Sequence, residues 1–103
     1  MEKKIKVGIL GATGSVGQKF IELLKDHPWF EIAELGASER SAGKKYKDAC
    51  NWIMKTGLKS EIADLEIKEC VPNFKSKLIF SGLDSSVAEE IETDFANAGY
   101  FII

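Results

Sequence analysis

The sequence predicts an α/β fold in which parallel strands form a doubly wound sheet covered by helices. Three observations support this class. Short apolar runs alternate with stretches of helical periodicity along the chain. A glycine-rich turn at residues 11–17 joins the first strand pattern to the first helix pattern. Residues 78–80 form a compact apolar run, which is typical of a strand buried on both faces of a parallel sheet.

The first predicted unit is a β-α-β crossover. A strand is expected at residues 5–10, a helix at 15–26 and a second strand at 30–35. Pro28 ends the helix because the residue before a proline avoids the helical conformation. Two strands joined in this way should be parallel, with a right-handed crossover. Four apolar positions of the helix are spaced to form its buried face: Val16, Phe20, Leu23 and Leu24.

The remaining elements continue this alternation. Apolar residues recur at helical spacing over 46–54, which predicts a short helix. A weakly alternating run at 65–71 predicts a third strand near an edge of the sheet, and the run 78–80 predicts a central strand. A last helix precedes a strand at 100–103. Its apolar face is expected to contain Val87, Ile91 and Phe95.

Composition indicates one ordinary globular domain. The chain has 103 residues, of which 45% are hydrophobic and 29% charged. Its net charge of −2 argues against a non-specific nucleic-acid binder, which needs a basic surface. No apolar run approaches the ~20 residues of a membrane span, and the one after the basic start is too short for a signal peptide. We therefore expect a cytoplasmic protein without nucleic-acid or membrane partners.

The glycine-rich turn Gly-Ala-Thr-Gly-Ser-Val-Gly, residues 11–17, is the most informative segment. Strand, glycine turn and helix in this order form a corner that holds phosphate. Glycine permits a sharp turn and lets backbone N–H groups approach an anion, while the positive end of the helix dipole points to the same place. The turn therefore predicts a site for the pyrophosphate of a dinucleotide. The residues expected to bind it are Gly11, Thr13, Gly14, Ser15 and Val16.

The second candidate segment, residues 37–45, follows the second strand, where dinucleotide-binding folds reach the adenosine ribose. Glu39 could accept hydrogen bonds from the 2′-hydroxyl of NAD. Arg40, with the hydroxyls of Ser38 and Ser41, would instead suit the 2′-phosphate of NADP, because a guanidinium donates two parallel N–H bonds to a phosphate. We favour NADP, although Glu39 would repel the phosphate unless its side chain pointed away.

A third contact is expected at Ser81, Gly82 and Leu83, which follow the central strand beside the first strand. Small residues there would let the cofactor pass close to the backbone. The alternative is an ordinary turn between a strand and a helix. Asp84 or Ser85 is a candidate cap for that helix.

Three motifs together resemble aspartate-semialdehyde dehydrogenases, and among them the archaeal and fungal branch. They are the glycine turn, the run Ala-Ser-Glu-Arg-Ser-Ala-Gly-Lys-Lys-Tyr at 37–46, and Phe-Ser-Gly-Leu-Asp-Ser-Ser-Val-Ala at 80–88. The resemblance implies a Rossmann-like fold and an oxidoreductase that makes aspartate semialdehyde from aspartyl phosphate, using NADPH and releasing phosphate. It implies a role in the biosynthesis of lysine, threonine and methionine. It also implies a homo-oligomer.

By this resemblance, residues 1–103 are the N-terminal dinucleotide-binding domain, truncated before the catalytic and dimerisation domain. The family's nucleophilic cysteine in an Asn-Cys motif, its acid-base histidine and its substrate-binding arginine have no counterpart here. We expect Cys50 and Cys70 to be reduced, partly buried thiols and His27 to be a surface or capping residue. No catalytic residue or metal ligand is assigned. Many family members carry proline where this chain has Asp84.

Three alternatives remain open. An N-acetyl-glutamyl-phosphate reductase would share the fold and the acyl-phosphate chemistry, but the run at 37–46 argues against it. An extended short-chain dehydrogenase or an NADP-sensing relative has a similar glycine turn. The Tyr-x-x-x-Lys motif that active members need is absent, because Cys50 stands four residues after Tyr46. A stand-alone nucleotide-binding or regulatory module would be complete at this length. Against it, the sequence stops in an apolar strand pattern, which favours a fragment.

Overall fold

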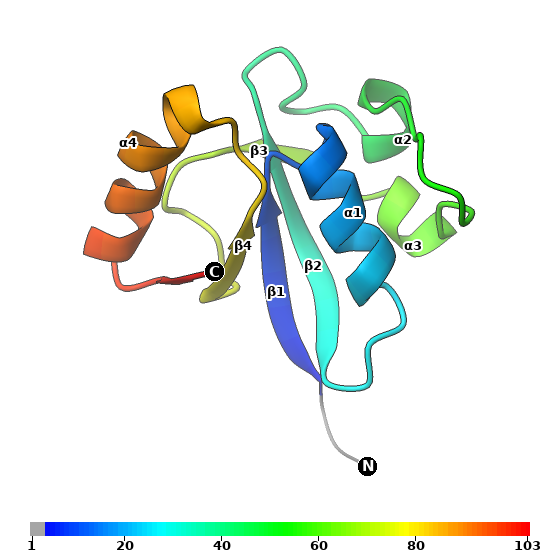
Figure 1. The fold of residues 1–103 in the computed structure, drawn as a ribbon, viewed down its shortest axis with the longest axis horizontal. Helices are drawn as coiled ribbons and strands as arrows, with labels where there is room; N and C mark the ends of the chain where they lie inside the picture. Colours follow the sequence, from blue (N-terminus) through cyan, green and yellow to red (C-terminus); the bar gives the residue numbers. More distant parts are fainter. Residues whose placement is uncertain (1–3) are drawn as a thin grey trace.

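The structure is a computed structural model that describes residues 4–103. It contains a five-stranded sheet in the order β3-β2-β1-β4-β5, with every pairing parallel (Figure 1). The strands are β1 (Ile5–Leu10), β2 (Phe30–Ala37), β3 (Ile67–Glu69), β4 (Leu78–Ser81) and β5 (Phe101–Ile102). The helices are α1 (Ser15–Leu24), α2 (Tyr46–Ala49), α3 (Ser60–Ala63) and α4 (Ser85–Asn97). The doubly wound parallel sheet predicted from the sequence is confirmed.

Helices cover both faces of the sheet. α1, α2 and α3 lie on one face and α4 lies on the other (Figure 1). Because side chains alternate along a strand, Val7 and Ile9 of β1 enter the core beneath α1, whereas Leu10 enters the core beneath α4. Tyr46 is fully buried in the first core and Phe95 in the second.

β1 is the central strand of the fold. Its last residue, Leu10, pairs with Gly36 of β2 on one side and with Ser81 of β4 on the other. The chain leaves β1 towards α1 on one face and leaves β4 towards α4 on the opposite face. The loops after these two neighbouring strands therefore diverge, which opens a crevice at the carboxyl ends of the strands.

The buried face of α1 matches the prediction only in part, and the helix ends at Leu24 rather than at residue 26. Of the four predicted positions, Leu24 is buried and Phe20 is partly buried against the same core, whereas Val16 is 56% and Leu23 is 63% exposed. The buried residues are Gly17, Gln18, Ile21 and Leu24. Gly17 explains the difference, because its missing side chain lets α1 lie directly on the glycine turn and fixes the rotation of the helix.

The middle of the chain is less regular than predicted. The helix expected over 46–54 is confined to the four residues of α2. α3 was not predicted, because Ile62 is the only buried position in its four residues. The third strand is shorter than the predicted 65–71, but it lies at the edge of the sheet as expected. β4 lies between β1 and β5, which confirms the predicted central position.

Glu34 of β2 joins three parts of the chain. Its carboxylate accepts hydrogen bonds from Lys68 Nζ at 2.9 Å, from the Ser76 amide at 2.6 Å and from the Lys75 amide at 3.1 Å. Burial alone would raise the pKa of the Glu34 carboxyl, but these donors outweigh it and lower the pKa to about 2. The charged carboxylate thus ties β2 to β3 and to the segment before β4.

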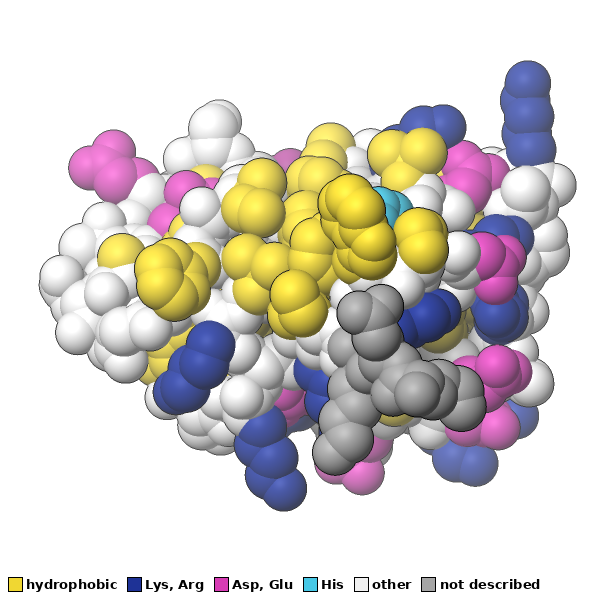
Figure 2. Space-filling model, turned by 90° about the horizontal axis from the view of Figure 1, so that it is seen from below, with side chains coloured by type: hydrophobic (Ala, Val, Ile, Leu, Met, Phe, Trp, Pro, Cys, Tyr) yellow, Lys and Arg dark blue, Asp and Glu magenta, His cyan; other side chains and the backbone are white. Residues whose placement is uncertain are grey.

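Apolar side chains are exposed at the end where the strands begin. Ile5 opens β1, Trp29 directly precedes β2 and Phe101 opens β5; their exposed fractions are 55%, 69% and 71%. Figure 2, which views this end from below, shows a broad group of hydrophobic side chains beside the histidine. His27 accepts a hydrogen bond from the Trp29 amide at 3.0 Å, so it caps the turn between α1 and β2 as expected.

Within residues 4–103, no helix combines the length and the apolar character that crossing a bilayer requires. Residues 1–3, part of the start considered above for a signal peptide, lie outside the described part of the chain.

Candidate functional site

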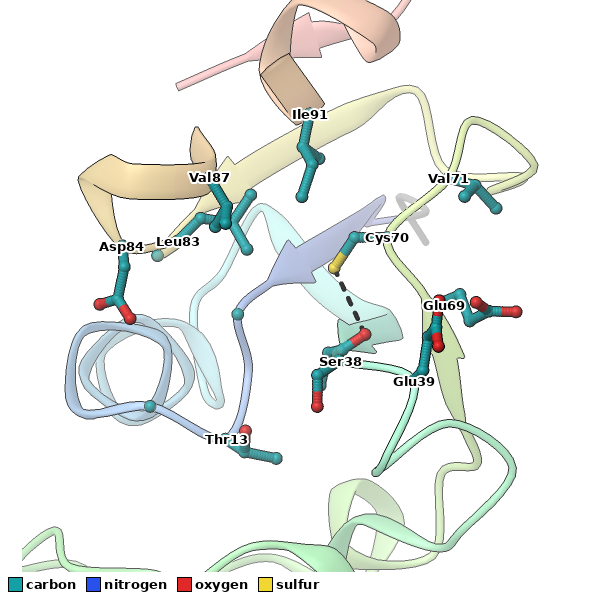
Figure 3. A pocket seen from close by; sticks show the side chains of 14 residues that line it. Thr13, Ser38, Glu39, Glu69, Cys70, Val71, Leu83, Asp84, Val87 and Ile91 are labelled. Atoms are coloured by element: carbon teal, nitrogen blue, oxygen red, sulfur yellow. Dashed lines mark hydrogen bonds between the residues drawn. The ribbon is translucent and has the colours of Figure 1, made fainter. Parts of the chain in front are cut away.

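A cleft of about 420 Å³ lies at the carboxyl ends of the strands, where the loops after β1, β2, β3 and β4 meet (Figure 3). Ligands of open parallel sheets bind in this place, where the strand order reverses. Parts of all three predicted segments reach the cleft. The lining residues are Gly11, Thr13, Gly14, Ala37, Ser38, Glu39, Glu69, Cys70, Val71, Gly82, Leu83, Asp84, Val87 and Ile91.

The glycine turn is held by close contacts between backbones. Gly11 adopts a left-handed φ of +69°, and a Cβ there would lie 2.7 Å from the carbonyl oxygen of Gly82. A Cβ on Gly17 would overlap the carbonyl oxygen of Gly11. At Gly14 a Cβ would find ordinary room, 3.6 Å from its nearest neighbour. Gly11 and Gly17 therefore allow the sharp turn, whereas Gly14 leaves the surface of the cleft open.

The first turn of α1 presents unpaired amides. The N-cap residue is Gly14, which has no side chain to accept from these amides, and the first turn contains no acidic residue. Within residues 4–103, the N–H groups of Thr13, Ser15 and Val16 donate to no backbone oxygen. The side chains of Ser15 and Val16 are exposed and do not line the cleft. Unpaired N–H groups at a helix start carry partial positive charge, which suits an anion.

The loop after β2 brings only some of the residues predicted near the 2′-phosphate to the cleft. Ser38 and Glu39 line the cleft, whereas Arg40 and Ser41 do not. A tight turn causes this division, because the Ser41 amide donates to the Ser38 carbonyl at 2.9 Å and carries the chain away. Arg40 is exposed and forms no ion pair within residues 4–103. Its side chain is exposed, and the preceding residue, Glu39, lines the cleft.

Of the residues predicted after β4, two line the cleft and one does not. Gly82 and Leu83 line it, but the Ser81 hydroxyl donates to Glu92 of α4 at 2.5 Å. The side chain of Ser81 is thus engaged with α4. Of the two candidate caps, Asp84 occupies the N-cap position of α4, but its side chain makes no cap hydrogen bond.

The cleft contains residues that the sequence did not reveal. Glu69, Cys70 and Val71 come from the end of β3, and Val87 and Ile91 come from α4 (Figure 3). These residues could not be predicted from the sequence, because only the strand order places the end of β3 beside the end of β2. The alternating pattern at 65–71 predicts a strand but indicates no ligand.

Both cysteines are free and partly buried, as expected. Cys70 Sγ lies 3.7 Å from the Ala37 carbonyl oxygen, to which it donates (Figure 3). Burial raises the pKa of the Cys70 thiol, and the Gly11 amide opposes this only in part. Burial also raises the pKa of Cys50. Neither thiol has the lowered pKa of an activated nucleophile. Across residues 4–103, no group of three or more carboxylate, thiol or imidazole side chains could hold a metal ion.

The fold and the cleft define a class of protein. A glycine turn at the start of a helix, a polar loop after the second strand and a cleft at the switch point are the features of a dinucleotide-binding domain. Residues 6–103 match the family described as "Semialdehyde dehydrogenase, NAD binding domain". The chain belongs to this family.

The chain is also similar in sequence to curated aspartate-semialdehyde dehydrogenases. The aspartate-semialdehyde dehydrogenase of Candida albicans is 54% identical over 101 residues, which cover 95% of this chain and 28% of that protein. That of Saccharomyces cerevisiae is 52% identical over 103 residues, covering 98% of this chain and 28% of that protein. That of Archaeoglobus fulgidus is 43% identical over 100 residues, covering 96% and 29%. The predicted fungal and archaeal resemblance is confirmed, and the chain spans about 28% of the length of the fungal relatives.

Solved structures share the fold. The crystal structure of aspartate-semialdehyde dehydrogenase with NADP from Candida albicans superposes with a TM-score of 0.92 at 50% identity, covering 97% of this chain and 29% of that one. Aspartate-semialdehyde dehydrogenase II of Vibrio cholerae, complexed with ASA, superposes with a TM-score of 0.67 at 25% identity, covering 97% and 30%. The fold is therefore Rossmann-like, as predicted.

Proposed function

We propose that residues 1–103 form the NADP-binding domain of an NADP-dependent aspartate-semialdehyde dehydrogenase. The family match and the similarity to the NADP-bound Candida albicans structure support this proposal. One geometric observation carries it: unpaired amides of the glycine turn stand beside a cleft at the switch point of the sheet. This arrangement fits a dinucleotide, whose pyrophosphate needs N–H donors and whose rings need a cleft beside them.

We assign the pyrophosphate to the turn that begins α1. The amides of Thr13, Ser15 and Val16 would donate to its oxygens, and the open surface at Gly14 would let the phosphates approach the backbone, while Gly11 forms the sharp turn at the edge of the cleft. The absence of an acidic residue from the first turn of α1 favours negative charge there.

We assign the adenosine ribose and its 2′-phosphate to the loop after β2. Ser38 lines the cleft, and the exposed side chain of Arg40 would fold over the phosphate, with Ser41 completing the polar group. Glu39 also lines the cleft, so its carboxylate repels a 2′-phosphate. Binding of NADP then depends on Arg40 to offset that repulsion.

We assign the path towards the nicotinamide to the loop after β4. Gly82 and Leu83 would contact the cofactor, while Ser81 would do so through its backbone because its hydroxyl is engaged with Glu92. Val87 and Ile91 provide an apolar wall beside this path. The bound cofactor would supply the reducing equivalent; this chain binds and orients it.

We further propose that the whole enzyme reduces aspartyl phosphate to aspartate semialdehyde as a cytoplasmic homo-oligomer, with catalytic and dimerisation residues outside 1–103. Such acyl transfer needs an activated thiol, a base and oxyanion donors. Cys50 and Cys70 have raised pKa values and His27 caps a turn, so we assign none of them a catalytic role. The relatives described above are aspartate-semialdehyde dehydrogenases and give no support to an N-acetyl-glutamyl-phosphate reductase.

Isothermal titration of the 103-residue chain with NADP and NAD tests the proposal. We expect saturable binding of NADP at one site, with weaker binding of NAD. The same sample should not reduce NADP when given aspartate semialdehyde and phosphate. Failure to bind either dinucleotide would refute the assigned site, and phosphate-dependent turnover would refute the placement of the catalytic residues.

A further inference from the structure

Two buried polar side chains hold the glycine turn from the side opposite the cleft. The hydroxyl of Tyr46 donates to the Ala12 carbonyl oxygen at 2.6 Å, and Nε2 of Gln18 donates to the Thr13 carbonyl oxygen at 3.0 Å. Tyr46 is fully buried and Gln18 is 2% exposed, and neither lines the cleft. Two consecutive carbonyl groups of the turn are thus bound from the core beneath α1.

The orientation of these carbonyls decides what the turn presents to a ligand. Across a trans peptide the C=O and the following N–H point in opposite directions. Residues 4–103 contain no cis peptide bond, so the Ala12 carbonyl and the Thr13 N–H are opposed. Because Tyr46 draws the Ala12 oxygen into the core, the Thr13 N–H points away from the core, and Thr13 lines the cleft (Figure 3). The same hydrogen bond keeps a carbonyl oxygen away from an incoming anion.

Gln18 fixes a second segment to the turn. Its Nε2 also donates to the Asn51 carbonyl at 3.0 Å, and its Oε1 accepts from the Ile53 amide at 2.8 Å. The side-chain amide therefore uses both its donors and its acceptor. The segment after α2 is thus held against the turn, and α2 is the helix that carries Tyr46.

We propose that Tyr46 is a positioning residue that aims the Thr13 N–H of the glycine turn at the pyrophosphate of the bound dinucleotide, and that Gln18 supports it by holding the Thr13 carbonyl and the segment after α2 in place. This inference rests on the proposed function. Burial, with a smaller contribution from Cys50, raises the pKa of the Tyr46 hydroxyl well above its usual value, so the hydroxyl keeps the proton that it donates.

Tyr46→Phe removes the hydroxyl and leaves the ring that fills the core. The chain offers a matched control in Tyr100→Phe. Tyr100 is also buried, at 7% exposure, and its hydroxyl likewise donates to a backbone carbonyl, that of Phe74, at 2.5 Å. It belongs to the other core, beneath α4. Both variants lose one buried tyrosine hydrogen bond, but only Tyr46→Phe releases the turn.

Four ligands separate a positioning role from a merely structural one. NADP, NAD and adenosine 5′-diphosphate contain a pyrophosphate, whereas adenosine 2′-monophosphate contains only the adenosine and its 2′-phosphate. We expect Tyr46→Phe to weaken the first three by a common factor of about three- to tenfold, the range for one lost hydrogen bond, and to leave the fourth unchanged. Tyr100→Phe should change none of the four affinities. Thermal unfolding of both variants measures their loss of stability independently of binding.

The Thr13 amide gives a second readout. In ¹H–¹⁵N spectra of the wild-type chain, this amide should shift downfield when adenosine 5′-diphosphate is added, and the shift should shrink in Tyr46→Phe. Unchanged affinities in Tyr46→Phe, equal weakening of all four ligands, or the same losses in Tyr100→Phe would overturn the positioning role. Failure of the wild-type chain to bind any of the four would instead overturn the proposed function itself, and the inference with it.

Discussion

Gly82, directly after β4, packs against Gly17 in the first turn of α1, backbone against backbone. A Cβ on Gly82 would lie 2.7 Å from the Gly17 amide nitrogen, and a Cβ on Gly17 would overlap the carbonyl oxygen of Gly11. The three glycines thus bring the turn after β1, the first turn of α1 and the start of the loop after β4 into direct backbone contact, and Gly11 and Gly82 also line the cleft. No side chain could move aside to relieve a clash, since each obstructing atom belongs to the backbone.

Gly82→Ala should therefore destabilise the chain and weaken dinucleotide binding. Overpacking of this kind typically costs about 1–3 kcal/mol, and here the added methyl would also separate the loop from α1. Chemical denaturation and NADP titration measure the two effects. Gly57→Ala is the matched control, because a Cβ there would meet nothing within 4 Å. A Gly82→Ala variant as stable as Gly57→Ala would contradict the close packing.

Arg40→Ala should weaken NADP binding about ten- to a hundredfold and leave NAD binding nearly unchanged. A hydrogen bond to a charged group contributes about 1.5–3 kcal/mol, and the Glu39 carboxylate in the cleft adds repulsion once the guanidinium is gone. Titration with both dinucleotides measures the difference. Lys55→Ala removes the same charge from an exposed residue outside the cleft and serves as the control. Equal losses for NADP and NAD in Arg40→Ala would refute the assignment.

Cys70 should be shielded from thiol reagents by NADP, whereas Cys50 should not. Cys70 lines the cleft and Cys50 does not, although both are partly buried and have raised pKa values. At pH 8 both thiols should react slowly, because little thiolate is present. Mass spectrometry of peptides after timed alkylation, with and without saturating NADP, resolves the two sites. Shielding of Cys50 alone, or of neither cysteine, would place the dinucleotide elsewhere.

The stability that the Glu34 carboxylate contributes to the fold should decrease as the pH falls. Its pKa is lowered from 4.5 to about 2 in the folded chain, so the contribution is fully present above about pH 4.5 and is lost as the pH falls towards 2. With allowance for screening by solvent, it amounts to about 2–3 kcal/mol at pH 7. Glu34→Gln should be less stable than the wild-type chain by about this amount.

Urea denaturation at pH 7 and pH 3 tests the direction. The gap in free energy of unfolding between Glu34→Gln and the wild-type chain should narrow at pH 3, because the wild-type carboxylate begins to take up a proton on unfolding. Glu31→Gln, at an exposed position of the same strand, is the control. A gap that stays constant between the two pH values would show that the charge of Glu34 contributes nothing.

Periodicity and glycine placement were enough to predict most of the fold. β1, β2, β4 and α4 occur where alternation or helical spacing is strong, and Pro28 and Gly99 bound the elements beside them. The predicted buried face of α1 was wrong at Val16 and Leu23. Hydrophobicity alone favours these two residues over Gly17 and Gln18, which are the ones buried. Whether an apolar residue is buried depends on what lies opposite it, and the described chain leaves those two positions exposed.

The candidate site also contains some residues that the sequence could predict and others that it could not. The glycine turn and the loops after β2 and β4 could be recognised locally, because their chemistry lies in consecutive residues. Glu69 and Cys70 enter the cleft through strand order, and Tyr46 and Gln18 reach the turn through the core. Such contacts join residues distant in the chain, and no single-sequence pattern encodes them.

The position of β1 at the centre of the sheet also affects how the chain can assemble. In a chain made from its N-terminus, β1 is complete long before its partner β4, which begins only at Leu78. Until then, one hydrogen-bonding edge of the most buried strand has no neighbour, and the loop that must close is long. A nascent chain that stalls before Leu78 would present an open apolar edge, which is the state that chaperones recognise and that associates with other copies.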